Sequence, residues 1–400
     1  MHYVRQVTDD LYWVGANDHR LTLFENIFPI PDGVSYNSYL LLDQKTVLFD
    51  TVDWSVCRLF LENIEHLLNG KSLDYVVINH IEPDHGASLE EILTKYPKAK
   101  IITSPKAVML MRQFGYHIDG RTEEVNEGDT KSFGKHVVKF IAAPMIHWPE
   151  VMVTFDTTNG VLFSADAFGS FKALDGKLFN DEVNYDRDWI DEARRYYTNI
   201  VGKYGPFVQK LLKKASGINI KMICPLHGLV WRSHLGYFLD KYDKWSRYEP
   251  EEKGVLIVYS SMYGNTENAV GALAGRIVEK GMPNVTVYDV SKTDVSYLIS
   301  ETFRMSHLVL ASVTYNLGIY PPMKNLLMDM KALNVQNRTA ALVENGSWAC
   351  RSGTLMRKFL EDEMKDMNIL DEKLTINSSL SEDNVPNLEL LADSIIQSMK

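Results

Sequence analysis

The segment Asn79-His80-Ile81-Glu82-Pro83-Asp84-His85 places two imidazoles and two carboxylates within six residues. It follows Asp74–Ile78, a short apolar run with β-branched residues that predicts a buried strand. The first histidine and the two carboxylates alternate along the segment, so an extended loop turns them to one side. The proline within the segment disfavours a helical turn there. The pattern predicts a loop of metal ligands at a strand end.

An alternative is an ordinary polar loop before a helix, with Asp84 or Ser88 as the N-cap. For any single residue of the segment this alternative is the better explanation. The complete pattern H-x-E-x-D-H instead favours metal binding.

Three further candidates each follow a predicted strand. His147 comes after Val137–Ile141, Asp166 ends a strand over Val161–Ala165, and His227 follows Asn219–Cys224. Singly, each could be a core histidine or a turn former. Together with the first segment they give four imidazoles and three carboxylates, the inventory for two adjacent metal ions with Asp166 as a bridge. The candidate ligands are His80, Glu82, Asp84, His85, His147, Asp166 and His227.

The composition is that of a globular protein with room for two domains: 400 residues, 45% hydrophobic and 24% charged. A net charge of −10 argues against nucleic acid as a partner. The cysteines Cys57, Cys224 and Cys350 form no C-x-x-C pair, which excludes a disulfide scaffold and a cysteine-only metal site. No signal-peptide pattern and no apolar run of roughly 18 residues occurs, so we expect a cytoplasmic protein without a membrane span.

The rest of the first half predicts a β-rich domain with helices. A hairpin is expected over Ser38–Leu42 and Thr46–Asp50 and another around Asn159-Gly160. Helices are expected at Val56–Leu68, Ser88–Tyr96, Pro105–Phe114 and, as one long tract, about Trp189 to Ala215. The charged segment Arg247–Gly254 predicts a linker, so we place one domain at 1–250 and a second at 254–400.

After the linker, strands and helices alternate. This alternation predicts an open, doubly wound parallel sheet of five strands with helices on both faces. The expected strands are Val255–Tyr259, Val285–Val290, Leu308–Val313, Ala340–Glu344 and Leu374–Asn377. The expected helices are Glu267–Glu279, Val295–Glu301, Pro322–Lys331, Thr354–Met367 and Pro386–Met399.

Three loops at the carboxyl ends of these strands have the chemistry of a mononucleotide site. In the first loop, hydroxyl groups, backbone amides left free by a glycine and the N-terminus of the following helix form a binding site for a phosphate. The loop lacks the residues of a Walker motif and of a dinucleotide-binding fingerprint. The other two add aromatic side chains and amides, although Trp348 could instead be core and Asn345-Gly346 a simple turn. The candidate residues are Ser260, Ser261, Met262, Tyr263, Gly264, Asn265, Thr266, Thr314, Tyr315, Asn316, Gly318, Asn345, Gly346, Ser347, Trp348 and Ala349.

With these motifs in view, the chain from about residue 5 to 398 resembles the flavodiiron proteins, also called A-type flavoproteins. The resemblance implies an α/β fold: a metallo-β-lactamase-like αββα sandwich followed by a flavodoxin-like domain. Hydrolases of the metallo-β-lactamase superfamily usually carry histidine where this chain has Glu82, and the carboxylate suits iron better than zinc. By the same resemblance His80, Glu82 and His147 hold one iron, Asp84, His85 and His227 hold the other, and Asp166 bridges them.

The resemblance also implies a function. Such a protein reduces dioxygen to water, or nitric oxide to nitrous oxide, at two non-haem irons, with electrons relayed through FMN from a donor such as rubredoxin. We expect the minimal two-domain class, working as a head-to-tail homodimer or dimer of dimers with Trp348 near the electron path. Trp148 and Phe168 are candidate walls of the gas pocket. A weaker hypothesis places donor docking at Arg351, Arg357 and Lys358.

Three alternatives remain open. The protein could be predominantly a nitric oxide reductase. It could be a metal-dependent hydrolase fused to a flavodoxin module, which zinc and hydrolytic activity would indicate. It could also be a plain electron carrier with a vestigial metal domain, against which the complete ligand set argues.

Overall fold

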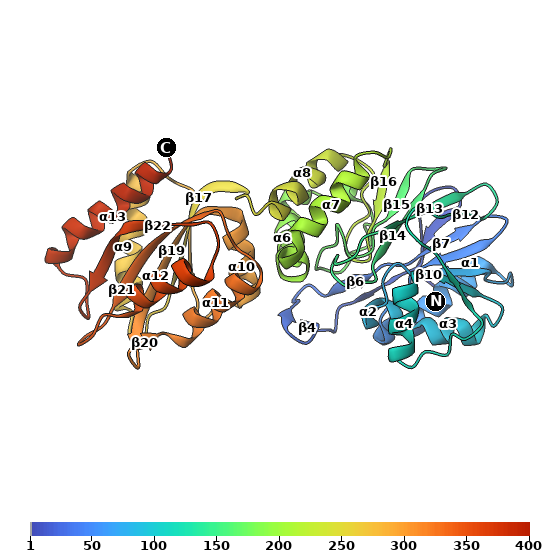
Figure 1. Cartoon of the computed structure of the whole chain (residues 1–400), viewed down its shortest axis with the longest axis horizontal. Helices are drawn as coiled ribbons and strands as arrows, with labels where there is room; N and C mark the ends of the chain where they lie inside the picture. The colour runs from blue at the N-terminus through green and yellow to red at the C-terminus, as the bar shows by residue number, and fades with distance from the viewer. Residues whose placement is uncertain (1) are drawn as a thin grey trace. The chain divides into compact units, whose positions relative to one another are not determined.

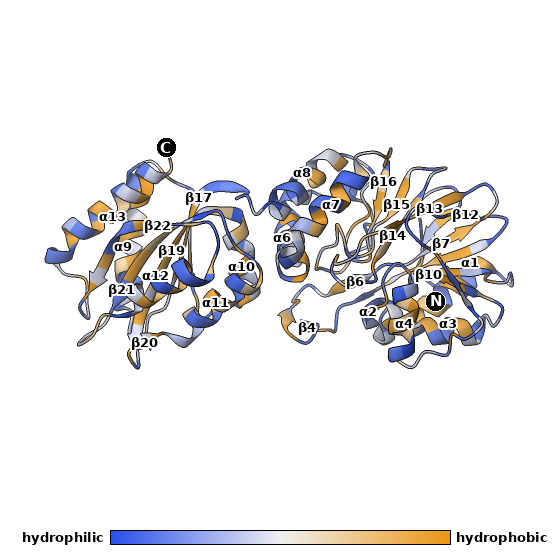
Figure 2. Ribbon diagram, viewed as in Figure 1, coloured by the Kyte–Doolittle hydropathy of each residue, from blue (hydrophilic) through white to orange (hydrophobic). Residues whose placement is uncertain are grey.

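A computed structural model describes residues 2–400, which fold as two compact units (Figure 1). The first unit ends at Tyr242 and the second is Asp243–Lys400. In both units the strands are mostly hydrophobic, while the helices mix hydrophobic and hydrophilic residues (Figure 2). Within residues 2–400 every helix is too short or too polar to cross a bilayer.

The first unit contains a seven-stranded mixed sheet in the order β1-β2-β7-β8-β9-β10-β11. Strands β1 to β8 of this sheet pair antiparallel, and β8 to β11 pair parallel. The expected hairpin is confirmed, since Tyr39 pairs with Phe49 and Leu42 with Thr46. The strands are β1 (Arg5–Gln6), β2 (Leu11–Trp13), β7 (Tyr39–Leu42), β8 (Thr46–Phe49), β9 (Tyr75–Val77), β10 (Lys100–Thr103) and β11 (Thr122–Glu124).

A five-stranded sheet in the order β12-β13-β14-β15-β16 faces the first one. Its strands are β12 (Thr130–Ser132), β13 (Val137–Ala142), β14 (Met152–Asp156), β15 (Val161–Phe163) and β16 (Met222–Cys224). One buried cluster draws side chains from both sheets. Phe49 stacks on Phe163 with ring centroids 3.8 Å apart, so the core lies between the sheets. The predicted sandwich is therefore confirmed.

Helices of the first unit begin and end where local chemistry allows. The Ser104 hydroxyl accepts a hydrogen bond from Ala107 N at the start of α4, where Pro105 supplies a fixed φ. Helix α1 ends on Asn69, whose left-handed φ of 46° precedes Gly70. The helices are α1 (Cys57–Leu68), α2 (Pro83–Gly86), α3 (Leu89–Lys95), α4 (Pro105–Gln113), α5 (Tyr185–Asp188), α6 (Ile190–Tyr196), α7 (Gly205–Ala215) and α8 (Leu235–Ser246).

Two expectations for this unit are wrong. Pro83 does not prevent a helical turn but begins α2, because proline is tolerated at the first helical position. The long tract is not one helix, since a π-helical segment at Tyr197–Val201 and a 3₁₀ turn at Gly202–Tyr204 separate α6 from α7. Two small hairpins, missed from sequence, complete the unit: β3 (Ala16–Asp18) with β6 (Val34–Tyr36), and β4 (Leu23–Phe24) with β5 (Phe28–Pro29).

A buried histidine ties the two sheets together away from the candidate metal loop. His136 Nδ1 lies 2.6 Å from Asp156 Oδ2, and His136 Nε2 lies 2.9 Å from Asp10 Oδ2. Lys135 also reaches Asp10, and the His136 amide donates to Asp43. Burial alone would lower the pKa of His136, but its hydrogen bonds to Asp10 and Asp156 raise it.

The His136→Gln variant should therefore destabilise the first unit in a pH-dependent way. Folding raises the pKa of this imidazole above 6.5, so its stabilisation is complete below pH 6.5 and is lost as the pH rises through the raised pKa. We expect a difference from wild type of about 2 kcal/mol at low pH, shrinking at high pH. Denaturant unfolding at several pH values measures it. His117→Gln, which alters an exposed histidine paired with Glu90, is the control and should change little; an equal difference at all pH values would contradict the prediction.

The second unit is the predicted doubly wound sheet, with parallel strands in the order β18-β17-β19-β21-β22. Its core contains strand residues and residues of α9 and α13. The strands are β17 (Glu252–Tyr259), β18 (Val285–Asp289), β19 (Met305–Tyr315), β21 (Arg338–Asn345) and β22 (Met367–Ile376), with the short β20 (Gly318–Ile319) antiparallel to β19. The helices are α9 (Asn265–Glu279), α10 (Val295–Arg304), α11 (Pro321–Ala332), α12 (Ser352–Glu363) and α13 (Val385–Ser398).

Two boundaries in this unit differ from the sequence-based expectation. The segment Arg247–Gly254 is not wholly a linker, since β17 begins at Glu252 and Tyr248 is buried. The helix expected to reach Met367 ends at Glu363, and Met367 begins β22. Charged residues obscured both boundaries, because neither segment shows a clear apolar period.

Candidate metal centre

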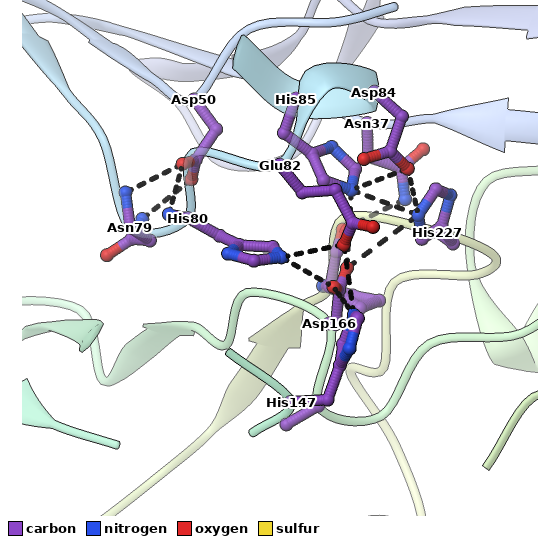
Figure 3. Close-up of polar contacts among 12 residues, drawn as sticks. Asn37, Asp50, Asn79, His80, Glu82, Asp84, His85, His147, Asp166 and His227 are labelled. Carbon is purple, nitrogen blue, oxygen red and sulfur yellow. Dashed lines mark hydrogen bonds and ion pairs between the residues drawn. The ribbon is translucent and has the colours of Figure 1, made fainter. Parts of the chain in front are cut away.

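Four separate segments bring the seven candidate ligands together (Figure 3). Two come from the loop after β9 and two from α2. The others follow β13, β15 and β16, each at a strand exit. Their ligand atoms fall into two groups: His80, Glu82, His147 and Asp166, and Asp84, His85 and His227.

The first group is compact. The Glu82 Oε2 atom lies 3.0 Å from His80 Nε2 and 3.0 Å from His147 Nε2. Asp166 Oδ2 lies 3.2 Å from each of the same two nitrogens. Four donor atoms therefore converge on one point.

The second group mirrors the first. Asp84 Oδ2 lies 3.2 Å from His85 Nε2 and 3.2 Å from His227 Nε2, and these two nitrogens are 3.0 Å apart. Asp166 turns its other oxygen, Oδ1, to this group, 3.2 Å from His85 Nε2. One carboxylate thus faces both groups with different oxygens.

The helical turn α2 explains why the ligands divide as they do. Parity along an extended loop predicted that Asp84 would join His80 and Glu82, and that is wrong. The chain turns at Pro83, so Asp84 and His85 point to the second group. The division between the groups is set by this turn.

The outer ring nitrogens indicate that the inner ones carry lone pairs. His227 Nδ1 lies 2.7 Å from the Ser35 carbonyl oxygen, which can only accept, so the proton is on Nδ1. His80 Nδ1 lies 2.6 Å from Glu150 Oε1. In the neutral rings the Nε2 atoms then face carboxylate oxygens as acceptors facing acceptors. A metal cation between them would satisfy both, as a proton on Nε2 would in its absence.

The pKa values of the clustered side chains also indicate that positive charge is favoured at this site. Burial alone would raise the pKa of Asp166, yet the facing imidazoles of His80 and His147 hold it well below its usual range. Burial also opposes protonation of His85 and His147, but the facing carboxylates raise their pKa values to about 10 and about 9. In the same residues, buried oxygens of Asp84 and Asp166 have no hydrogen-bond donor within residues 2–400. These residues fit a pair of metal cations.

A buried network fixes the ligand loop from behind. Asp50, at a φ of 56°, accepts hydrogen bonds from Asn79 N at 2.7 Å, Asn79 Nδ2 at 2.7 Å and His80 N at 3.2 Å. Thr154 Oγ1 donates to Asn79 Oδ1 at 2.7 Å. The backbone entering the loop is therefore held before any metal is bound.

Several residues near the cluster were missed or placed differently. Glu150 and Asp50 gave no signal beyond being acidic residues near strands. The Tyr196 hydroxyl is buried without a hydrogen-bond partner in the described chain, and its ring centroid lies 5.4 Å from that of His227. Trp148 lies edge-on to His80 at 5.5 Å, while Phe168 packs on Tyr242 at 4.4 Å.

A second candidate site lies in the second unit. A cavity of about 460 Å³ opens among the loops after β17, β19 and β21. All the candidate residues quoted from the sequence line it except Ser260, Gly264 and Gly318, while Val313, Leu317 and Ser378 line it without having been predicted. Ser260 is buried behind its loop, where its hydroxyl accepts from Val313 N.

The cavity has the features of a mononucleotide site. Gly264 has a φ of 89° at the N-cap of α9, and its amide donates to Ser261 Oγ at 3.0 Å. The start of a fifteen-residue helix leaves amides for a phosphate. Trp348 is 90% exposed rather than core, so its ring is free to pack on a planar ligand. Arg357 and Lys358 of the docking hypothesis pair with Glu361 and Asp362, on their own helix.

Comparison with known proteins gives the chain a family. A model described as the ODP family beta lactamase matches residues 34–228. An anaerobic nitric oxide reductase flavorubredoxin of Aeromonas hydrophila is 32% identical over 370 residues, 91% of this chain and 74% of that protein. The chain belongs to the flavodiiron protein family. Flavodiiron proteins are oxidoreductases that carry FMN and a non-haem diiron site.

Solved structures of flavodiiron proteins match along nearly the whole chain. The rubredoxin oxygen:oxidoreductase of Desulfovibrio gigas has a TM-score of 0.91 at 29% identity and covers 99% of this chain and 98% of its own. The flavodiiron protein of Giardia intestinalis has a TM-score of 0.92 at 26% identity and covers 100% and 98%. The fold expected from the sequence is thereby confirmed in both units.

Proposed function

We propose that this flavodiiron protein reduces dioxygen to water, nitric oxide to nitrous oxide, or both. One observation carries the proposal: seven candidate metal ligands from four segments converge as two facing groups that share Asp166. The names of its relatives support both gases, since one is a nitric oxide reductase and another an oxygen oxidoreductase. The assigned domains are 1–250 for the metal centre and 254–400 for FMN.

In this proposal each group of side chains holds one iron. His80, Glu82 and His147 would bind the first, Asp84, His85 and His227 would bind the second, and Asp166 would be shared by both. When bound, FMN would supply electrons, and the two irons would supply electrons and Lewis acidity for a diatomic gas. The protein's residues hold and orient the ligands: Glu150 and the Ser35 carbonyl fix the rings of His80 and His227, while Asp50 fixes the loop.

The external donor is proposed from the names of the relatives, and the assembly from the resemblance to the family. We expect rubredoxin or a similar small redox protein as the donor, a head-to-tail homodimer or dimer of dimers as the working unit, and a cytoplasmic location. All three cysteines are free, which suits a reducing compartment. Light scattering of the purified protein measures the oligomeric state, and a monomer at micromolar concentration would contradict the proposed assembly.

The proposed function is tested on purified protein. Iron and FMN are quantified, the protein is reduced anaerobically, and consumption of dioxygen and of nitric oxide is followed separately. We expect two irons and one FMN per chain and turnover of at least one gas. Zinc in the centre together with hydrolytic activity, or full reduction without consumption of either gas, would overturn the proposal.

Replacing Trp348 should weaken flavin binding specifically. Trp348→Ala removes an exposed aromatic face at the cavity, and stacking of a planar ring on such a face contributes about 1–3 kcal/mol. We therefore expect the Kd for FMN to rise by about 10-fold to 100-fold, measured by quenching of flavin fluorescence. Trp54→Ala, at a 61% exposed tryptophan of the first unit, is the matched control. An equal Kd for FMN in the two variants would show that Trp348 does not contact the flavin.

A further inference from the structure

The outer nitrogens of three imidazoles in the metal centre meet different partners. His80 Nδ1 faces the Glu150 carboxylate at 2.6 Å, and His227 Nδ1 donates to the neutral Ser35 carbonyl at 2.7 Å. His85 Nδ1 is buried and lacks a hydrogen-bond partner in the described part of the chain. Of these three rings, only that of His80 has a carboxylate hydrogen-bonded to its outer nitrogen, whereas the buried Asp50 acts on His85 through space alone.

Glu150 is held firmly in this position. Its side chain is fully buried, and its Oε1 atom also accepts a hydrogen bond from Ile81 N at 3.2 Å. The backbone carbonyl of Glu150 accepts from Ser104 Oγ at 2.9 Å. Its second oxygen, Oε2, is buried with no donor among residues 2–400. The hydrogen bonds of the Glu150 carboxylate are therefore made to the His80 ring and to the backbone of the loop that carries it.

This arrangement makes the two halves of the centre unequal in charge. The first group has the Glu82 carboxylate as a ligand and Glu150 bonded to the outer nitrogen of His80, whereas the second group has the Asp84 carboxylate as a ligand and no carboxylate bonded to the outer nitrogen of His85 or His227. Asp166 is shared by both. Ferric iron carries one more positive charge than ferrous iron, so a buried anion favours the ferric state nearby. A carboxylate on Nδ1 also makes the imidazole a stronger donor.

We propose that Glu150 is a positioning residue that makes the His80–Glu82–His147 half of the centre the first to be oxidised. The proposal rests on the proposed function, because it requires that the two groups hold iron. It adds to that function the order in which the two irons are oxidised. The second half has no carboxylate bonded to an outer imidazole nitrogen, so its iron stays ferrous to a higher potential.

Two variants separate this charge effect from a general loss of buried charge. Glu150→Gln keeps an oxygen that can accept from His80 Nδ1 and removes the negative charge. Asp156→Asn is the matched control, since Asp156 Oδ2 lies at the same 2.6 Å distance from His136 Nδ1 at the far end of β14. Both residues are buried in the same unit.

The measurement is an anaerobic redox titration followed by electron paramagnetic resonance, with iron quantified in each sample. In wild type we expect two separate one-electron steps, with a mixed-valent signal between them. In Glu150→Gln the first step moves toward the second, and the comproportionation constant falls by about 10-fold, equivalent to 59 mV for one electron. Asp156→Asn should titrate as wild type does.

Each outcome decides the question. Wild-type protein that binds fewer than two irons after reconstitution overturns the proposed function itself. Glu150→Gln with two irons and an unchanged comproportionation constant overturns this inference alone. If Glu150→Gln retains fewer than two irons after reconstitution, Glu150 serves to hold the metal rather than to order its oxidation, and the inference is overturned.

Discussion

The Asp166→Asn variant should purify with less than one iron per chain and lose gas consumption by more than about 100-fold. Asp166 directs Oδ2 to His80 and His147 and Oδ1 to His85. The amide that replaces it is neutral and has only one oxygen, so it cannot place an anion between two cations. Both halves of the centre should weaken together, which separates a bridging ligand from an ordinary one.

Metal analysis and FMN quantification on the same sample check this result. FMN content should stay at the wild-type value, because the flavin cavity lies wholly within the second unit. Asp156→Asn removes another buried carboxylate of the first unit and should keep both irons. Asp166→Asn protein that retains two irons would show that this residue does not bridge the pair.

The sequence was sufficient to find the seven clustered side chains because each sits where a strand ends. Strand exits at one edge of a sandwich converge, so His147, Asp166 and His227 could be placed near the first loop without coordinates. The division of the seven ligands into two groups was harder to predict. Chain parity pointed Asp84 toward His80 and Glu82, whereas the family resemblance placed it with His85 and His227, as in the structure, where the turn at Pro83 sets its direction.

The residues that support the ligands could not have been predicted. Glu150 becomes a partner of His80 through the fold, across 70 positions of sequence. Ser35 contributes a backbone carbonyl, which no side-chain pattern reveals. In the second unit the alternation of strand and helix predicted an open parallel sheet but not its strand order, and Ser378 reaches the cavity from a turn after β22 that no motif marked. The local sequence pattern predicts helices and strands, whereas the tertiary fold decides which distant residues contact the ligands.

A buried arginine in the second unit gives the other large expected effect. Arg338, at the start of β21, is 2% exposed and forms no ion pair with a carboxylate of residues 2–400. Its guanidinium donates to the carbonyls of Thr302 and Phe303, near the end of α10, and to that of Tyr248 before β17. Further bonds reach Gln336 and Asn337. One side chain thus joins three segments through their backbones.

Arg338→Met should lower the unfolding free energy of the second unit by about 3 kcal/mol or more, because several buried carbonyls lose a charged donor. Arg338→Lys should recover only part of this loss, since an ammonium group has three donors and lacks the planar fork of arginine. Denaturant unfolding followed by flavin release measures both variants. Arg276→Met is the control, since Arg276 makes its ion pairs with Glu279 and Glu389 at the surface and should matter little. If Arg338→Met released its flavin at the same denaturant concentration as wild type, the carbonyl cluster would be satisfied by water, and Arg338 would have no role in joining the segments.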